Sequence, residues 1–144
     1  MAKNCITDCT YALIIFNAKN KKIHIGNSRR SNFVRGFYVY IGSAKKNITS
    51  RIKRHLSNDK KKFWHIDYFL STVGVQIQEI WTSPEEKECQ TAQLFLGIGF
   101  PFIKRFGSSD CRCLSHLFFA SKKHTDIKNL LKKNGFRNIY IAAN

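Results

Sequence analysis

The stretch Tyr-Val-Tyr-Ile-Gly-Ser-Ala-Lys-Lys-Asn-Ile-Thr-Ser-Arg-Ile-Lys-Arg-His, residues 38 to 55, sets the organisation of the chain. The β-branched and aromatic run at residues 37–41 predicts a strand, which we expect Gly42 to end. Beyond the glycine, apolar side chains recur every four residues, at Ile48, Ile52 and Leu56. This spacing is typical of an amphipathic helix, so the stretch predicts a strand, a turn and a helix in succession.

Polar side chains in this stretch suit phosphate chemistry. Arg51 and His55 are four residues apart and are expected on one flank of the helix, with Arg54 turned to solvent. Arginine binds phosphate oxygens in a bidentate fork, and tyrosine or histidine can transfer protons. Tyr38 and Tyr40 share a strand face, where paired tyrosines are more often packing residues, so a packing interpretation stays open.

The same residues resemble the GIY-YIG nucleases. Residues 40–43, Tyr-Ile-Gly-Ser, resemble the second half of that signature, and Tyr11 stands in the first half with Cys9 in place of the usual glycine. Three segments are similar to one branch of small, poorly characterised prokaryotic members: Phe37–Ala44, Trp64–Tyr68 and Phe106–Cys111. The resemblance extends from about Tyr11 to Phe119.

The resemblance implies an α/β (α+β) fold, with a small central antiparallel sheet flanked by helices in a single domain of residues 1–144. It implies a metal-dependent endonuclease that hydrolyses phosphodiester bonds. Tyr11 or Tyr40 would be the general base, and which of them serves is left open. Arg51 would stabilise charge on the phosphate, His55 would carry a proton or contact the leaving group, and Glu88 would bind the metal.

Glu88 also stands out without the resemblance. Ala92 and Phe95 follow it at helical spacing, so its carboxylate is expected on an apolar face. A buried acid needs a metal or an ion pair, and a salt bridge to a Lys or Arg is the alternative. Mg²⁺, or Mn²⁺, is the expected ion because carboxylate oxygens with retained waters suit it.

The charge of the chain predicts an anionic partner. Its 144 residues include 25 Lys and Arg against 9 acids, a net charge of +16. Such an excess is typical of nucleic-acid binding, and DNA is the expected partner, although RNA would also fit. Candidate contacts to the phosphate backbone cluster in one region: Lys45, Lys46, Arg54, Lys60, Lys61 and Lys62. A non-catalytic binding module of the same fold would explain the charge equally well.

Five cysteines and no secretory signal or membrane-spanning run predict a reduced, cytoplasmic protein. Cys111, Cys113 and His116 could supply three zinc ligands, with Cys89 or His65 as the fourth. Because the spacing differs from the usual Cys-x-x-Cys knuckle, we favour two small residues packed at the start of a strand. A zinc-stabilised interaction domain is a third functional class.

Two further segments are candidate sites. His65 and Asp67 lie in the Trp64–Tyr68 segment, where they do not face each other on a helix. Trp64 is expected in the core or on a base-stacking surface. The small residues at 107–109, followed by Asp110, could contact a phosphate through backbone amides.

The remaining pattern predicts the other elements of the fold. Strands are expected at residues 11–16, 22–26, 75–81, 114–120 and 139–142, with an exposed loop at 27–32 and a loose segment at 1–8. Helices are expected at residues 63–73 and 124–134. A third helix should begin with Ser83 as N-cap and Pro84 in its first turn, and should end near residue 96.

Overall fold

Five antiparallel strands form the central sheet, in the order β6-β4-β1-β5-β7. The computed structural model describes residues 8–26, 29–121 and 125–143. The strands are β1 (Thr10–Asn17), β4 (Gly36–Ser43), β5 (Val75–Ser83), β6 (Leu117–Ser121) and β7 (Arg137–Ile141). The expected α+β class, an antiparallel sheet flanked by helices, is confirmed.

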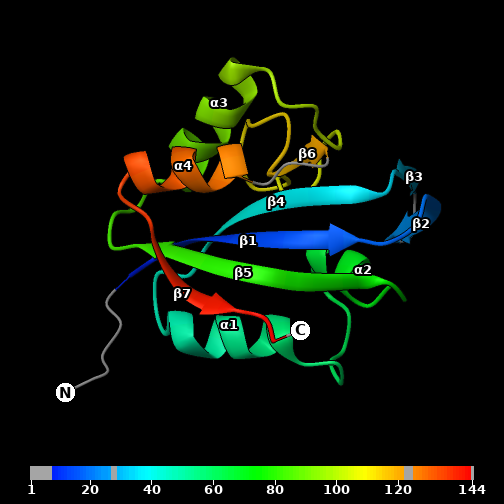
Figure 1. Cartoon of the computed structure of the whole chain (residues 1–144). Coiled ribbons are helices and arrows are strands. Elements are labelled where there is room, and N and C mark those ends of the chain that lie inside the picture. The colour runs from blue at the N-terminus through cyan, green and yellow to red at the C-terminus, as the bar shows by residue number, and fades with distance from the viewer. Residues whose placement is uncertain (1–7, 27–28, 122–124, 144) are drawn as a thin grey trace.

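Helices cover both faces of this sheet (Figure 1). The helices α1 (Ile48–Leu56) and α2 (His65–Leu70) lie on one face, and α3 (Glu88–Ile98) and α4 (Thr125–Lys133) lie on the other. Alternate residues of β1 serve the two cores: Leu13 points to the α1–α2 side, whereas Ile14 points to the α3–α4 side. The central strand is therefore buried on both faces, which is why it is apolar almost throughout.

A separate two-stranded sheet joins β2 (Lys21–Ile25) to β3 (Arg29–Phe33). Ile23, Ile25 and Phe33 are buried and join the α1–α2 core. The expectation of a loop at residues 27–32 is therefore wrong for 29–32. The core residues Ile23 and Ile25 come from β2, so the polar residues opposite them in β3 can pair along the hairpin without supplying core side chains.

Several predicted boundaries shift. Gly42 does not end its strand, because β4 continues to Ser43 and pairs with β1 throughout. The predicted helix start at Ser83 is wrong: Ser83 pairs with Thr10 in the β5–β1 ladder, so its backbone belongs to the sheet. Helix α3 begins only at Glu88, after a bent connection in which Thr10 Oγ1 donates to the Glu85 carbonyl.

Other elements are shorter than predicted. Helix α2 covers only residues 65–70 of the expected 63–73, and β6 begins at Leu117 rather than 114 because residues 103–116 form a loop tied back on itself. In that loop the His116 amide donates to the Phe106 carbonyl. Asp8, expected in a loose segment, is buried and bonded to Thr82, whereas residues 1–7 lie outside the described part.

None of the helices in the described ranges is both long enough and apolar enough to cross a membrane.

Candidate functional site

One cavity of about 480 Å³ collects four of the five residues that the resemblance assigns to catalysis and metal binding. Tyr11 comes from β1, Tyr40 from β4, Arg51 from α1 and Glu88 from the first turn of α3. Asp110, from the 103–116 loop, is exposed and also lines the cavity. Five segments of the chain thus converge where β1 and β4 meet the start of α3.

His55 lies behind Tyr11 rather than in the cavity wall. The Tyr11 hydroxyl is 2.7 Å from His55 Nε2, and both side chains are buried. Burial lowers the pKa of His55 to about 3, so its ring is neutral near pH 7 and Nε2 can accept the tyrosine proton. Within the described residues, Nδ1 of the same ring has no hydrogen-bond partner.

The two cavity tyrosines are both protonated near neutral pH. Burial raises the pKa of Tyr11 to about 12, although the Arg51 guanidinium favours the ionised form. Burial raises the pKa of Tyr40 well above its ordinary value, and it is further raised by the neighbouring Tyr11. Only Tyr11 has a histidine on its hydroxyl, so the surroundings distinguish the two.

Gly42 is required by the position of Tyr11. A Cβ atom on Gly42 would lie 2.4 Å from Cζ of the Tyr11 ring, closer than any real side-chain contact. The glycine therefore lets the tyrosine ring cross the neighbouring strand and reach His55. A second glycine, Gly107, lies against Tyr40: a Cβ atom at Gly107 would be 3.0 Å from Cε1 of the Tyr40 ring. Gly107 also has a φ of +69°, a backbone conformation that favours glycine.

Arg51 is held from two sides. Its Nη1 donates to the Ser43 carbonyl at 2.9 Å, and its guanidinium stacks on the Trp64 ring, 4.3 Å from the centroid. Arg54 stacks on the same ring, also at 4.3 Å. Trp64 is thus placed between two guanidinium groups and cannot serve as a stacking platform for a base. It fixes the direction of Arg51 instead.

Arg54 is not turned to solvent as predicted. Its two terminal nitrogens donate to the two carboxylate oxygens of Asp67, at 2.7 and 2.8 Å. The prediction failed because helical position alone does not show the buried acid that follows in the next segment. Arg54 is therefore a structural residue, and its expected contact with nucleic acid is not supported.

Asp67 organises the start of α2. The carboxylate also accepts hydrogen bonds from the Phe63 and Trp64 amides, and its side chain is fully buried. Burial raises the pKa of the Asp67 carboxyl, but the Arg54 ion pair and these two amides outweigh it and lower the pKa overall. Asp67 therefore positions Trp64, and through Trp64 it positions Arg51.

His65 connects two of the sequence motifs. Its Nδ1 accepts a hydrogen bond from the Gly107 amide at 2.9 Å, and its ring packs edge-on against Phe106. The Trp64–Tyr68 segment and the 106–111 loop are therefore neighbours in space. His65 positions this loop against the cavity and is not one of the clustered thiol and imidazole ligands described next.

A second cluster lies on the other side of Glu88. The ligand atoms of Cys89, Cys111, Cys113 and His116 all lie within 4.8 Å of one another, so this Cys₃His group could hold a metal ion. Of the two candidates for the fourth ligand, Cys89 and His65, it is Cys89 that α3 brings to the pair of loop cysteines, so the preference for simple packing is not supported. His116 Nδ1 lies 3.3 Å from the Glu88 carboxylate and links the cluster to the cavity.

The three thiols differ in acidity. Burial acts against ionisation of Cys113, but hydrogen bonds, chiefly from His116, outweigh it and lower the pKa of Cys113. Burial, together with the neighbouring cysteines, raises the pKa of Cys89 to about 12, and burial also raises the pKa of Cys111. Burial acts against protonation of His116, but Glu88 and Cys113 outweigh it and raise its pKa.

Comparison with known proteins places the chain in one family. A model described as "Domain of unknown function DUF123" matches residues 10–136. The chain belongs to the DUF123 family. No curated protein and no solved structure matches it.

In this DUF123 chain the predicted basic contacts divide into two groups. Lys45, Lys46, Lys61 and Lys62 are exposed. Lys60 is instead half-buried, and its ammonium donates to the carbonyls of Arg54, His55 and Ser57, which closes the C-terminal end of α1. Burial lowers the pKa of Lys60.

Sequence reasoning missed two features of the DUF123 site. Phe63 lines the cavity with 75% of its surface exposed. A second cavity of about 490 Å³ shares His65 and Ser109 with the first and is lined by Lys104, Arg105 and Arg112. The sequence contained a signal for Phe63, which directly follows the lysine run at 60–62. It contained no signal for the second cavity, which forms only when the 103–116 loop folds.

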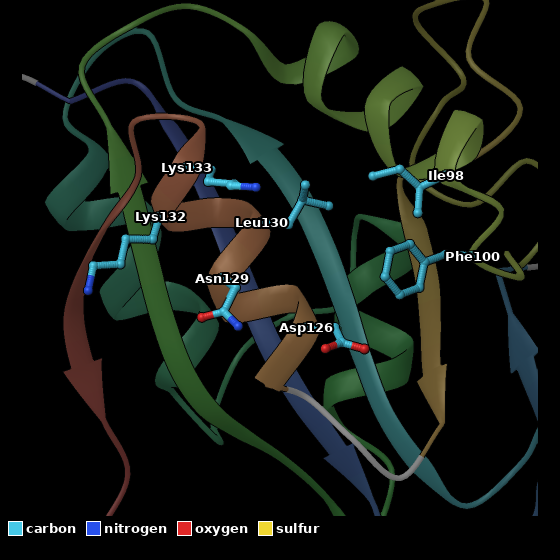
Figure 2. A pocket seen from close by; sticks show the side chains of 7 residues that line it. All are labelled: Ile98, Phe100, Asp126, Asn129, Leu130, Lys132 and Lys133. Carbon is cyan, nitrogen blue, oxygen red and sulfur yellow. The ribbon is translucent and has the colours of Figure 1, made fainter.

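A larger cavity lies elsewhere. It has a volume of about 650 Å³ and lies between the C-terminal end of α3 and helix α4, where Ile98, Phe100 and Leu130 form an apolar wall beside Asp126 and Lys133 (Figure 2). It contains none of the predicted site residues. Volume therefore does not identify the chemically equipped site in this fold.

Proposed function

We propose that this chain is a metal-dependent endonuclease that hydrolyses phosphodiester bonds in DNA, as its resemblance to the GIY-YIG nucleases implies. The observation that carries the proposal is the 2.7 Å contact between the Tyr11 hydroxyl and His55 Nε2 behind a cavity that Arg51 and Glu88 also line. A proton acceptor, a fixed cation and a carboxylate then face one substrate position, which is what phosphodiester hydrolysis requires.

Tyr11 is the proposed general base, and His55 receives its proton. Forming a free tyrosinate with a pKa of about 12 at pH 7 would cost about 7 kcal/mol, since each pH unit corresponds to 1.36 kcal/mol. A relay avoids the free tyrosinate: Tyr11 takes a proton from the attacking water while it passes its own proton to His55 Nε2, a protonation that costs about 5 kcal/mol at pH 7 because the pKa of His55 is about 3. The tyrosine then need not carry a full charge at any stage.

Arg51 stabilises the charge that develops on the phosphate. One guanidinium nitrogen of Arg51 donates to the Ser43 carbonyl, and the face of the guanidinium stacks on Trp64. The other N–H donors lie in the cavity wall, where they can bind phosphate oxygens. A donor fixed in advance requires little reorganisation in the transition state, and such groups contribute about 10²–10³ in rate. Asp67 and Trp64 are the positioning residues for this arginine.

Glu88 is the proposed ligand of a divalent cation, Mg²⁺ or Mn²⁺. Its side chain is partly exposed and lines the cavity, and a single carboxylate completed by waters and substrate oxygens suits Mg²⁺. The bound cation would polarise the phosphate and stabilise the leaving oxygen. Asp110 lines the same cavity and is a second oxygen donor within this wall.

The charge distribution favours a nucleic-acid substrate. The net charge is +16, and Lys61 and Lys62 follow α1 on the exposed surface next to Phe63 at the cavity rim. The adjoining cavity adds the basic wall of Lys104, Arg105 and Arg112. The phosphates on either side of the reacting phosphate would then contact the two lysines on one side of the site and the basic wall on the other.

The proposal is tested by cleavage of a panel of duplex, branched and single-stranded DNA and of RNA, in Mg²⁺, Mn²⁺ or chelator. Tyr11→Phe should lower the single-turnover rate by about 10²–10⁴, the usual contribution of a general base. Tyr40→Phe should cost less because Tyr40 has no histidine partner. Tyr38→Phe is the matched control, since its buried hydroxyl donates to the Val34 carbonyl outside the cavity.

A non-catalytic DNA-binding module is the second candidate. The observation that favours it is that neither cavity tyrosine is ionised near neutral pH. Such a module would bind the panel with the same charge dependence but would cut none of it, and Tyr11→Phe would leave its affinity unchanged.

A further inference from the structure

The Cys₃His cluster joins two separate segments of the chain. Cys89 is the second residue of α3, whereas Cys111, Cys113 and His116 lie in the 103–116 loop, with His116 directly before β6. Helix α3 begins without a side-chain cap at Lys87. The loop between α3 and β6 contains no strand or helix of its own. We therefore expect the start of α3 and this loop to stabilise each other through their contacts.

The distances within the cluster match a tetrahedral metal site. Metal bonds of about 2.3 Å to sulfur and 2.0–2.1 Å to nitrogen place tetrahedral ligand atoms roughly 3.6–3.8 Å apart. Cys111 Sγ lies 3.5 Å from His116 Nε2, Cys89 Sγ lies 4.0 Å from the same nitrogen, and no pair exceeds 4.8 Å. Side-chain shifts of less than an ångström would close the site.

The chemistry of the donors selects among metals. Three thiols and one imidazole are soft or borderline ligands, which suit zinc and are poor partners for Mg²⁺ or Ca²⁺. His116 is 1% exposed and Cys113 is 9% exposed, whereas Cys89 and Cys111 are half-buried, so the inner side of the group is shielded and its outer side faces the second cavity. With all four positions filled by the protein, the site would be closed, as structural zinc sites are.

We propose that Cys89, Cys111, Cys113 and His116 bind one structural zinc ion, and that Glu88 is the outer partner of the zinc ligand His116. Binding releases the three thiol protons to solvent, because the ligands are thiolates and a neutral imidazole. The ion then ties the N-terminal turn of α3 to the loop that carries the cavity residues Gly107 and Asp110.

Glu88 gives the proposed site a second consequence. His116 directs Nε2 toward the sulfurs and Nδ1 toward the Glu88 carboxylate at 3.3 Å. A carboxylate on the free nitrogen of a zinc-bound histidine fixes its tautomer and its orientation. The zinc would in turn hold Glu88 in place, and only this coupling to the cavity rests on the proposed nuclease function.

The metal content of the full chain tests the zinc site directly. Untagged protein purified under reducing conditions should contain one zinc ion per chain, and replacement by Co²⁺ should give the visible absorption of tetrahedral cobalt with thiolate ligands. Cys113→Ser should lose the zinc, whereas Cys9→Ser should keep it, because Cys9 contacts the Pro84 carbonyl outside the cluster. Wild-type protein that neither contains zinc nor takes it up, or that carries a disulfide between cluster cysteines, would overturn the proposal.

A competition titration with a zinc chelator tests the role of Glu88. Glu88→Gln should weaken zinc binding by about 10- to 100-fold, the usual effect of losing an outer partner, while one zinc still binds at saturation. Glu86→Gln is the matched control, since Glu86 accepts from the Ser43 hydroxyl and does not contact His116. Equal affinities of the two variants would contradict the coupling. This readout is independent of cleavage, so an inactive protein with a zinc site would refute the proposed function alone.

Discussion

The hydroxyl of Tyr11 lies 2.7 Å from Nε2 of His55, and both side chains are buried between β1 and α1. The two residues are 44 positions apart, and Gly42 makes their contact possible because no larger residue could lie against the Tyr11 ring. The pair combines a neutral imidazole with a protonated phenol, so it is a hydrogen-bonded donor and acceptor and not an ion pair.

The buried histidine should make folding sensitive to acid. The pKa of His55 is lowered from 6.5 to about 3, so the unfolded chain binds this proton more readily than the folded one. Its contribution to stability is complete above about pH 6.5 and is lost as the pH falls toward 3. Urea denaturation between about pH 4 and pH 6 should show a slope of about 1.4 kcal/mol per pH unit from this group.

His55→Gln should flatten this slope, whereas His24→Gln removes an exposed histidine and should not. His116 does not contribute to the slope in that range. Its pKa is raised in the folded protein, so below its unfolded pKa of about 6.5 the folded and unfolded chains both bind this proton. Identical slopes for His55→Gln and wild type would show that His55 is not the titrating group.

Asp67 should be the most sensitive single position outside the cavity. Asp67→Asn removes one charge of the ion pair with Arg54 and is expected to cost about 3 kcal/mol in the free energy of unfolding, the low end for buried pairs because Arg54 is 28% exposed. The loosened Trp64 should also reduce cleavage. Asp59→Asn, at an exposed position, is the control, and equal thermal stability of the two variants would refute this assignment.

The lysine run should separate into a binding part and a structural part. Replacing Lys61 and Lys62 by Ala should flatten the slope of log affinity against log salt by roughly 1.8 on duplex DNA, about 0.9 for each lost phosphate contact. Lys60→Ala should instead lower the melting temperature, because its ammonium binds two carbonyls of α1 and the carbonyl of the C-cap residue Ser57. A salt slope unchanged in the double variant would leave the two lysines as solvated surface.

Phe63 should contribute to substrate affinity through its exposed ring. Stacking of a base on an aromatic side chain contributes about 1–3 kcal/mol, so Phe63→Ala should weaken binding to DNA with unpaired bases by about 10- to 100-fold. Phe63→Trp should retain affinity. Val73→Ala, at another exposed apolar position away from the cavity, should leave binding unchanged. Fluorescence anisotropy would measure all three, and wild-type affinity in Phe63→Ala would exclude stacking there.

The sequence predicted the elements better than their limits. The 37–41 run and the spacing of Ile48 and Ile52 correctly predicted a strand and a helix, because burial of alternate or every fourth residue leaves a periodic pattern. The Ser83 cap failed because sheet pairing with Thr10 overrides a local helix signal. Gly42 was predicted to end its strand, but it lies inside β4 and makes room for the ring of Tyr11 on the neighbouring strand β1.

The site residues likewise divide into those that the sequence motifs predicted and those whose role depends on tertiary contacts. Tyr11, Tyr40, Arg51 and Glu88 were singled out from motifs, and they do line one cavity. The roles of Trp64 and Asp67 could not be derived, because the stacking of Arg51 on Trp64 and the ion pair between Arg54 and Asp67 form only in the tertiary structure. Cys89 likewise joins Cys111 only after α3 and the loop have packed.

Magnesium-dependent cleavage by wild type and by Glu88→Gln is the sharpest test of the proposed nuclease. Wild type should cut at least one DNA substrate of the panel in Mg²⁺ and none in chelator. Glu88→Gln, loaded with saturating zinc, should bind the same DNA without cutting it, and Glu86→Gln should cut as wild type does. The absence of cleavage by wild type on every substrate, or a Glu88→Gln variant that cuts as fast as wild type, would refute metal-dependent hydrolysis at Glu88.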